Sequence, residues 1–160
     1  MFDTQILLSP KVMRDVVPSY DTNINHWRQL ADDDENMAAV LPGKPSSTGL
    51  ARLFSPMQAA LVAIMADFIR VDVKAPLAAK IARRVMEAHL AQPSVEQWAV
   101  VVTANGNVST LAYDETGLRA GFVSGSRLAF ALVVDLRNYA ERVAAGIADA
   151  PKVIGGDDGE

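Results

Sequence analysis

Prolines divide the first 93 residues of the chain into short helical segments. Ser9-Pro10 is typical of a helix start, because a serine hydroxyl can cap the first turn and proline suits the first helical position. Pro18 is expected to end that helix, since the residue before a proline is driven out of the α region. Ser19 or Asp21 can then cap a second helix that continues to about Leu30. The pattern predicts two short helices joined by a tight turn.

Two longer helices are expected to follow. Ser55-Pro56-Met57-Gln58 combines a serine cap, a proline at the first helical position and a glutamine at the third, which together form a capping box. Apolar residues then recur at helical spacing as far as Phe68. The next helix is predicted from Pro76 to Pro93, with one apolar face and basic residues on its other sides.

Residues 31–53 are predicted to be mainly loop. The stretch from Pro42 to Gly49 is rich in turn formers, and Val40-Leu41 and Leu50 to Phe54 are expected to pair as a small β-ribbon across that tip. For the stretch from Ala31 to Ala39, the pattern leaves both a helix and disorder open.

The pattern changes in the last part of the chain. Trp98 to Thr103 and Val108 to Tyr113 are rich in strand-forming residues and flank Asn105-Gly106, a strong signal for a hairpin turn. Leu128 to Val134 is expected to form a third strand, and Asp135 to cap a last helix.

The chain is therefore predicted to be an α+β protein with a boundary near Pro93. Residues 1–93 would form an α-rich domain, and residues 94–150 a small αβ domain made of a β-hairpin, a third strand and a C-terminal helix. Residues 151–160 have little apolar surface to bury and are expected to be disordered.

The sequence lacks the patterns of several enzyme and metal sites. It has no cysteine, which removes disulfides, thiolate ligands and thiol catalysis together. His26 and His89 are far apart in the sequence and show no metal-binding spacing. A calcium-binding EF-hand loop starting at Asp32 would need Gly and Glu where Met37 and Gly43 stand. The phosphate-binding and serine-nucleophile motifs each miss a required glycine. We therefore predict no enzyme activity, no metal and no cofactor.

No membrane association is expected either. No apolar run reaches the roughly 18–20 residues needed to cross a bilayer. The first residues, Met1 to Gln5, contain no basic segment of the kind that opens a secretory signal. A cytoplasmic protein is the prediction.

The net charge of −4 at first argues against nucleic-acid binding, but the charges are unevenly distributed. Residues 1–93 hold ten basic and ten acidic residues, and four of these acids form one block, Asp32-Asp33-Asp34-Glu35. Without this acidic block the first 93 residues would carry a charge of +4. Whether the front part of the chain can meet DNA thus depends on where the acidic block lies.

Three sequence stretches point to one family. Arg52-Leu53-Phe54-Ser55 is similar to an Arg-x-Tyr-Ser step that follows a wing, and Asn23 to Arg28 to a Thr-Leu-Arg-Tyr-Tyr-like stretch in a second helix. Val71 to Ala79 is similar to a turn that leads into a fourth helix. Over about residues 6–91 the chain thus resembles the MerR-type winged helix-turn-helix regulators, with Asn25 where that family has an arginine.

The resemblance implies a dimeric, DNA-binding transcriptional regulator. In a winged helix-turn-helix the second helix enters the major groove and the hairpin wing meets the backbone. Asparagine suits a bidentate contact to adenine, and arginine suits guanine or phosphate. The residues implied on or near the recognition helix are Tyr20, Thr22, Asn23, Asn25, His26 and Arg28. Those implied as wing contacts to the backbone are Lys44, Ser46, Ser47 and Arg52.

Other interpretations stay open at this point. Ile24 and Trp27 are expected to be core residues that anchor the second helix. The chain could instead be a winged-helix protein-interaction module that has lost DNA binding and meets a basic protein partner through its acidic block. Residues 94–150 could form a homodimer interface through edge strands and the last helix, or could hold a small-molecule effector.

Overall fold

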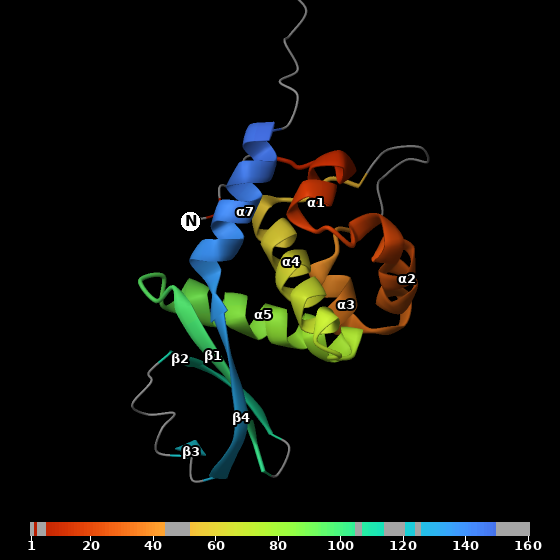
Figure 1. The fold of residues 1–160 in the computed structure, drawn as a ribbon. Helices are drawn as coiled ribbons and strands as arrows, with labels where there is room; N and C mark the ends of the chain where they lie inside the picture. The colour runs from red at the N-terminus through yellow and green to blue at the C-terminus, as the bar shows by residue number, and fades with distance from the viewer. Residues whose placement is uncertain are drawn as a thin grey trace, which may run out of the picture.

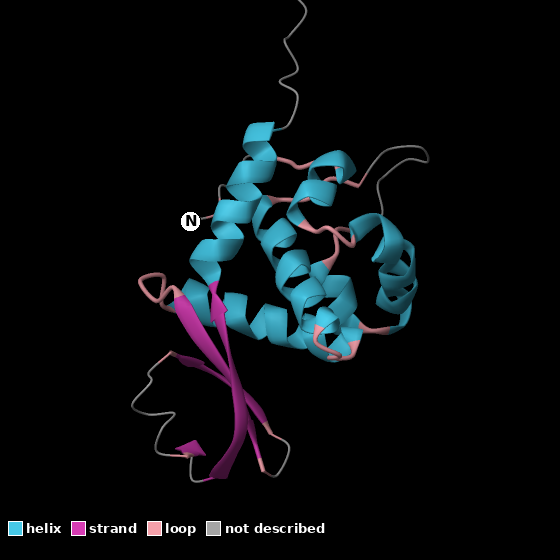
Figure 2. Cartoon of the chain, in the orientation of Figure 1, coloured by secondary structure: helices cyan, strands magenta, loops and turns pink. Residues whose placement is uncertain are grey.

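A computed structural model describes Phe2 and residues 6–43, 52–104, 107–113, 121–123 and 126–149, with the backbone alone at residues 122, 123 and 126. Its helices are α1 (Pro10–Val16), α2 (Tyr20–Asp33), α3 (Glu35–Val40), α4 (Pro56–Arg70), α5 (Ala75–Ala91) and α7 (Leu136–Asp149). Its strands are β1 (Gln97–Thr103), β2 (Val108–Ala112), β3 (Phe122–Val123) and β4 (Ser126–Asp135). The fold is mixed α+β, as predicted. The helices form one body, from one end of which the antiparallel sheet extends (Figures 1 and 2).

The predicted starts of α1 and α4 are confirmed, whereas Ser19 stands at the N-cap of α2 without a side-chain hydrogen bond to it. Ser9 caps α1, and Ser55 and Gln58 form the expected capping box at the start of α4. In that box the Gln58 amide donates to Ser55 Oγ at 3.1 Å, and the Ser55 amide donates to Gln58 Oε1 at 3.0 Å. Proline fixes the first turn of each of these helices, and α1 ends at Val16, two residues before Pro18.

Of the two possibilities left open for Ala31 to Ala39, the helix is confirmed. Helix α2 continues to Asp33, and α3 follows from Glu35 to Val40. Between them the Asp34 carboxylate accepts two backbone N–H groups, from Asn36 and Met37, at 2.9 Å each. The acidic sequence is thus helical because one of its carboxylates caps the next helix, which the periodicity of apolar residues does not reveal.

The predicted β-ribbon is wrong for the described residues. Val40 is the last residue of α3 and Leu41 its C-cap. Phe54 pairs instead with Leu8, through backbone hydrogen bonds of 2.7 and 2.9 Å. The segment before α1 therefore takes the place that the ribbon partner was expected to fill. The tip of the predicted ribbon lies outside the described residues.

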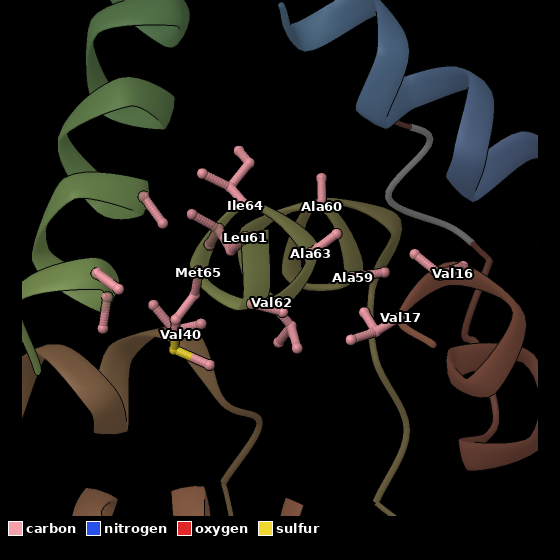
Figure 3. Packing of buried hydrophobic residues seen from close by; sticks show 14 of the residues in the cluster. Val16, Val17, Val40, Ala59, Ala60, Leu61, Val62, Ala63, Ile64 and Met65 are labelled. Carbon is pink, nitrogen blue, oxygen red and sulfur yellow. The ribbon is translucent and has the colours of Figure 1, made fainter. Parts of the chain in front are cut away.

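Helix α4 is at the centre of the main core. Every residue from Ala59 to Ala66 is buried, so this helix has no solvent face over two turns. Figure 3 shows its side chains pointing to several sides, with Val16 and Val17 from the first helix region and Val40 of α3 around it. Many of these α4 side chains are alanines, which allow neighbouring helices to approach closely.

The strands form an antiparallel sheet in the order β2-β1-β4-β3. The hairpin prediction is confirmed in its strands, since β1 pairs with β2 as far as Val102 and Val108. The predicted turn at Asn105-Gly106 lies outside the described residues, as do residues 151–160. The short strand β3 is an addition that the sequence pattern did not predict.

The main core crosses the boundary predicted near Pro93. Trp98 of β1, Val134 of β4 and Val143 of α7 belong to the same buried cluster as the residues of α4. Helix α7 also lies close to α1, where a Cβ added at Gly146 would come within 2.9 Å of a Val16 methyl group. A glycine at this position therefore sets the distance between the first and last helices.

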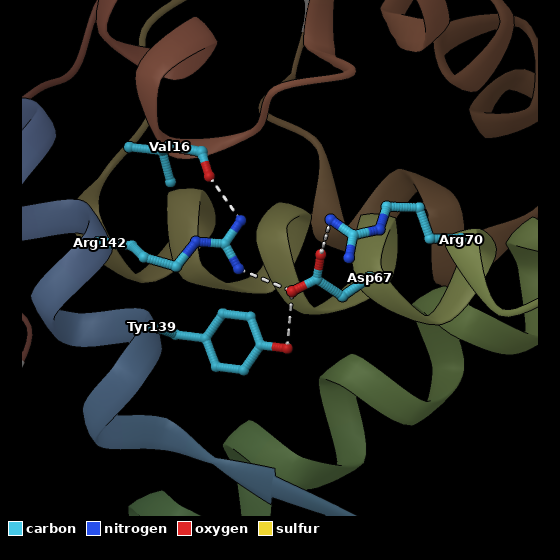
Figure 4. Close-up of polar contacts among 5 residues, drawn as sticks. All are labelled: Val16, Asp67, Arg70, Tyr139 and Arg142. Carbon is cyan, nitrogen blue, oxygen red and sulfur yellow. Dashed lines mark hydrogen bonds and ion pairs between the residues drawn. The ribbon is translucent and has the colours of Figure 1, made fainter.

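A polar cluster fixes α7 against α4 and α1 (Figure 4). Asp67 accepts hydrogen bonds from Arg142, at 2.7 Å, and from the Tyr139 hydroxyl, at 3.1 Å. The other arm of the Arg142 guanidinium donates to the Val16 carbonyl at 2.8 Å. Burial first, and then the Asp67 carboxylate, raise the pKa of Tyr139 far above its usual value. The Tyr139 hydroxyl therefore stays a donor.

Replacing Asp67 should loosen this attachment. Asp67→Ala leaves Arg142 and Tyr139 without their shared acceptor, and we expect it to lower the free energy of unfolding by about 1–3 kcal/mol. Asp15→Ala, which removes an exposed carboxylate on α1, is the control and should change stability by less than about 0.5 kcal/mol. Urea unfolding followed by circular dichroism measures both, and equal effects would contradict the role given to Asp67.

Candidate nucleic-acid interface

Helices α1 and α2 are joined by a tight turn of three residues, Val17, Pro18 and Ser19. The Val17 amide donates to the Met13 carbonyl at 2.8 Å, and the Tyr20 amide to the Val17 carbonyl at 2.9 Å. A connection of three to four residues is usual in helix-turn-helix motifs. Helix α2 lies at the edge of the helical body away from the sheet (Figure 1).

One face of α2 belongs to the core. Tyr20, Ile24 and Trp27 are buried, as the spacing of Ile24 and Trp27 predicts. The Tyr20 ring meets the Phe54 ring edge to face, with 5.9 Å between the centroids. The side chain of Tyr20 is 2% exposed, so this residue anchors α2 and is left out of the candidate interface.

The opposite face of α2 is polar and exposed. Asn25 and His26 lie three and four residues after Thr22, and Gln29 lies four and three residues after them, so all four share one face and all are exposed. Gln29 was missed by the sequence reasoning, although its position one turn after Asn25 could have found it. Asn23 is half-buried, and its side-chain amide donates to the Ser19 carbonyl at 3.0 Å, so it closes the first turn of the helix.

Three arginines from different segments act electrostatically on Tyr20 of α2. Burial raises the pKa of Tyr20, while the positive charges of Arg28, Arg14 and Arg52 act in the opposite direction. The ion pair of Arg14 with Asp21 places that arginine beside the first turn of α2, and Arg52 lies two residues before Phe54, whose ring meets that of Tyr20. Arg14 was not among the sequence-predicted site residues, since only the fold brings it beside α2.

These arginines differ in how they are held. Arg14 is exposed and forms an ion pair of 2.8 Å with Asp21, in the first turn of α2. Arg28 is half-buried, and its Nε atom has no hydrogen-bond partner among the described residues. Arg52 is likewise half-buried. Of the other predicted wing contacts, Lys44, Ser46 and Ser47 lie outside the described residues.

The acidic block lies at the other end of α2. Asp32 and Asp33 are exposed in its last turn, Asp34 is committed to capping α3, and Glu35 begins that helix. A 14-residue helix is about 21 Å long. The block therefore does not lie at the start of α2, where Arg14 and Asp21 are.

The described residues offer little for other site types. His26 is exposed, whereas His89 is buried and its Nδ1 atom lies 2.9 Å from the Val95 carbonyl, so it ties the end of α5 to the following turn. Within the described ranges, no three His, Asp or Glu side chains are grouped so that they could hold a metal ion. Among the same residues, no helix combines the length and apolar character needed to cross a bilayer.

A hollow on the surface lies between α5 and β2. It is lined by Lys80 and Arg84 together with Val108, and the Arg84 guanidinium donates to the Val108 carbonyl at 3.1 Å. This contact uses Arg84 to hold the sheet against α5.

Comparisons with known proteins add no family. No protein-family model matches the chain, and a search of curated proteins gives no match.

The burial of Tyr20 leads to a testable difference between two tyrosines. The Tyr20 hydroxyl is buried and has no hydrogen-bond partner among the described residues, so we expect Tyr20→Phe to raise the free energy of unfolding by about 1 kcal/mol. Tyr139→Phe is the matched control: it removes a hydrogen bond to Asp67 and should lower that free energy by about 1 kcal/mol.

The pH dependence should change as well. The fold raises the pKa of Tyr20 above its ordinary value of 10.0, so the unfolded chain loses this proton at a lower pH than the folded one. The free energy of unfolding is therefore unaffected by this group below pH 10.0 and falls as the pH rises above it. Tyr20→Phe should reduce this alkaline loss, measured by thermal unfolding between neutral and alkaline pH. If Tyr20→Phe made the protein less stable than the wild type, the Tyr20 hydroxyl could not be a buried group without a hydrogen-bond partner.

Proposed function

We propose that this protein is a sequence-specific DNA-binding transcriptional regulator of the winged helix-turn-helix type, similar to the MerR-type regulators, that acts as a homodimer in the cytoplasm. The observation that carries the proposal is the exposed polar face of α2, which follows α1 after a tight turn. In this assignment residues 1–93 bind DNA, residues 94–150 hold two copies together, and α2 is the recognition helix.

The side chains on α2 fit the major groove. Asn25 and Gln29 can each make paired hydrogen bonds to adenine, and Thr22 can contact either a base or a phosphate. In helix-turn-helix proteins the residues near the start of the second helix reach the base edges. The first two turns of α2 contain Thr22 and Asn25, so the face most suited to reading bases is at the correct end.

The arginines suit the phosphate backbone. Arg14 of α1 pairs with Asp21 in the first turn of α2, and Arg52 lies two residues before Phe54, whose ring meets that of Tyr20. Cations placed in this way fix the register of a protein on the duplex without reading its sequence. Arg28 lies one turn beyond Asn25 and can reach either a phosphate or a guanine.

The rival proposal is a winged-helix module that binds a basic protein through the acidic block. Asp33 and Glu35 are exposed and could serve such a contact. Asp34, however, caps α3 inside the fold, and the block begins at Asp32, twelve residues after Tyr20 at the start of α2. The position of the block thus favours DNA binding, because like-charge repulsion of phosphates is kept away from the start of α2.

Selection of bound duplexes from a random pool, followed by fluorescence anisotropy at low salt, tests the function. Low salt is used because phosphate attraction is strongest there. We expect enrichment of a defined sequence and binding that weakens as salt is added. No binding to any duplex at low salt would reject the proposal, and binding of a basic protein partner instead would favour its rival.

Two substitutions separate base reading from phosphate contact. Asn25→Ala should weaken binding to the selected duplex by about 1–3 kcal/mol and relax the preference at one base pair. Arg52→Ala should weaken binding to all duplexes and reduce the salt slope by about one. Asn138→Ala, an exposed asparagine on α7, is the matched control for Asn25→Ala. Equal binding by Asn25→Ala and Asn138→Ala would show that α2 does not read bases.

A further inference from the structure

The hollow between α5 and β2 has the size of a small-molecule binding site. Its volume is about 520 Å³. Sites for small ligands in proteins are mostly clefts of about 300–1,000 Å³, lined by apolar side chains and a few polar groups. Helix α5 lies at the end of the helical body from which the sheet extends, so the hollow is at the junction of the two (Figure 1).

One face of α5 supplies both apolar and cationic side chains to the hollow. Lys80 and Ile81 lie three and four residues after Leu77, and Arg84 lies four and three residues after them, so all four share one side of the helix. Ile81 is buried, whereas Leu77 is 42% exposed. Half-buried Val108 of β2 also lines the hollow. Apolar surface and two positive charges are therefore present in one place.

The two positive charges are not balanced inside the hollow. None of the described residues that line it is acidic. Lys80 forms no ion pair within the part of the chain that the structure describes. Glu87, one turn after Arg84, is instead paired with Arg83 at 3.2 Å. Since like charges one turn apart on a helix repel each other, an anion between Lys80 and Arg84 would stabilise this face.

Arg84 keeps hydrogen-bond donors for a ligand. One N–H group of its guanidinium donates to the Val108 carbonyl at 3.1 Å. A guanidinium has five such donors in one plane, so this contact orients the group and uses one of them. An arginine held in this way is suited to the oxygens of an acidic group, which it can bind through two parallel hydrogen bonds.

We propose that the hollow between α5 and β2 binds a small organic anion. Its acidic group lies between Lys80 and Arg84, and its apolar part lies against Leu77, Ile81 and Val108. A carboxylate, a sulfonate or a phosphate can serve as the acidic group, because each offers oxygens that accept from both cations.

A small ligand accounts for the hollow better than the backbone of a nucleic acid does. Contacts to the backbone need exposed cations and leave apolar side chains such as Leu77 in water. A ligand with an apolar part covers these side chains and neutralises the charges at once. The site goes beyond the proposed function and does not depend on it, because binding of the anion is measured without DNA.

A matched pair of fluorescent probes tests the site on the full chain. Anilinonaphthalene sulfonate is an apolar anion, and phenylnaphthylamine is the same ring system without the sulfonate. We expect the sulfonate to bind the wild type at least about tenfold more tightly than the neutral probe. Fluorescence titrations in the absence of DNA give both dissociation constants.

Substitutions separate the charge from the apolar surface. Lys80→Gln should weaken binding of the sulfonate by at least about threefold and leave the neutral probe unchanged, since only a charge is lost. Leu77→Ala should weaken both probes, because it removes apolar surface. Lys11→Gln is the matched control: it removes an exposed lysine of α1 that does not line the hollow, and it should change neither dissociation constant.

Nuclear magnetic resonance of the methyl groups locates the bound probe. The methyl signals of Leu77, Ile81 and Val108 should shift when the sulfonate is added. Val133, a 49% exposed residue on β4 that does not line the hollow, reports binding to a different apolar surface. Its signals should stay in place.

Four outcomes would overturn the site. They are no binding of the sulfonate, equal binding of the two probes by the wild type, equal effects of Lys80→Gln and Lys11→Gln, and shifts at Val133 in place of the hollow. Circular dichroism of each variant shows that it is folded. Failure of the DNA-binding proposal appears instead as a lack of duplex binding, so the two failures give different results.

Discussion

The burial of α4 on all sides is the constraint on which the rest of the structure depends. A helix without a solvent face must be covered by several elements at once, and here α1, α3, α5 and α7 all contact it. The last of these comes from the far end of the sequence and is held by Asp67, the one acidic residue of α4. Covering α4 therefore requires the chain to return through the sheet, and the front and back of the sequence share one core.

This arrangement leaves two unlike surfaces on different parts of the molecule, one on α2 at the side of the helical body and one on β4 in the sheet (Figure 1). Helix α2 touches the body through Tyr20, Ile24 and Trp27, so its other face is free to carry polar residues at no cost to the core. Strand β4 is anchored at Val134 by the core and extends away from the helices, so Phe130 and Leu132 remain exposed. Polar residues on one surface and apolar residues on the other suit two different partners.

The sequence reveals those parts of the fold that depend on local signals. The Ser-Pro starts at Ser9 and Ser55 and the β-rich runs could be predicted, because caps and strand propensity act within a few residues. The pairing of Phe54 with Leu8 could not, since it joins segments far apart in the chain. The candidate site was likewise predictable only in part. The polar residues of α2 follow from their spacing in the sequence. Arg14 comes close to α2 only through the fold, and Tyr20 turns inward to meet Phe54.

The proposed function connects the polar face of α2 with the rest of the fold. A single recognition helix reads only a few base pairs, and regulators of this type gain specificity when a two-fold axis presents two helices to a symmetric site. Strand β4 runs directly into α7, and Arg142 of α7 donates to the Val16 carbonyl at the end of α1. Since α1 leads into α2 after three residues, the sheet and the polar face of α2 are connected through packed elements. In a dimer of the proposed regulator, the fold itself would set the spacing between two copies of α2, and with it the spacing of the half-sites on DNA.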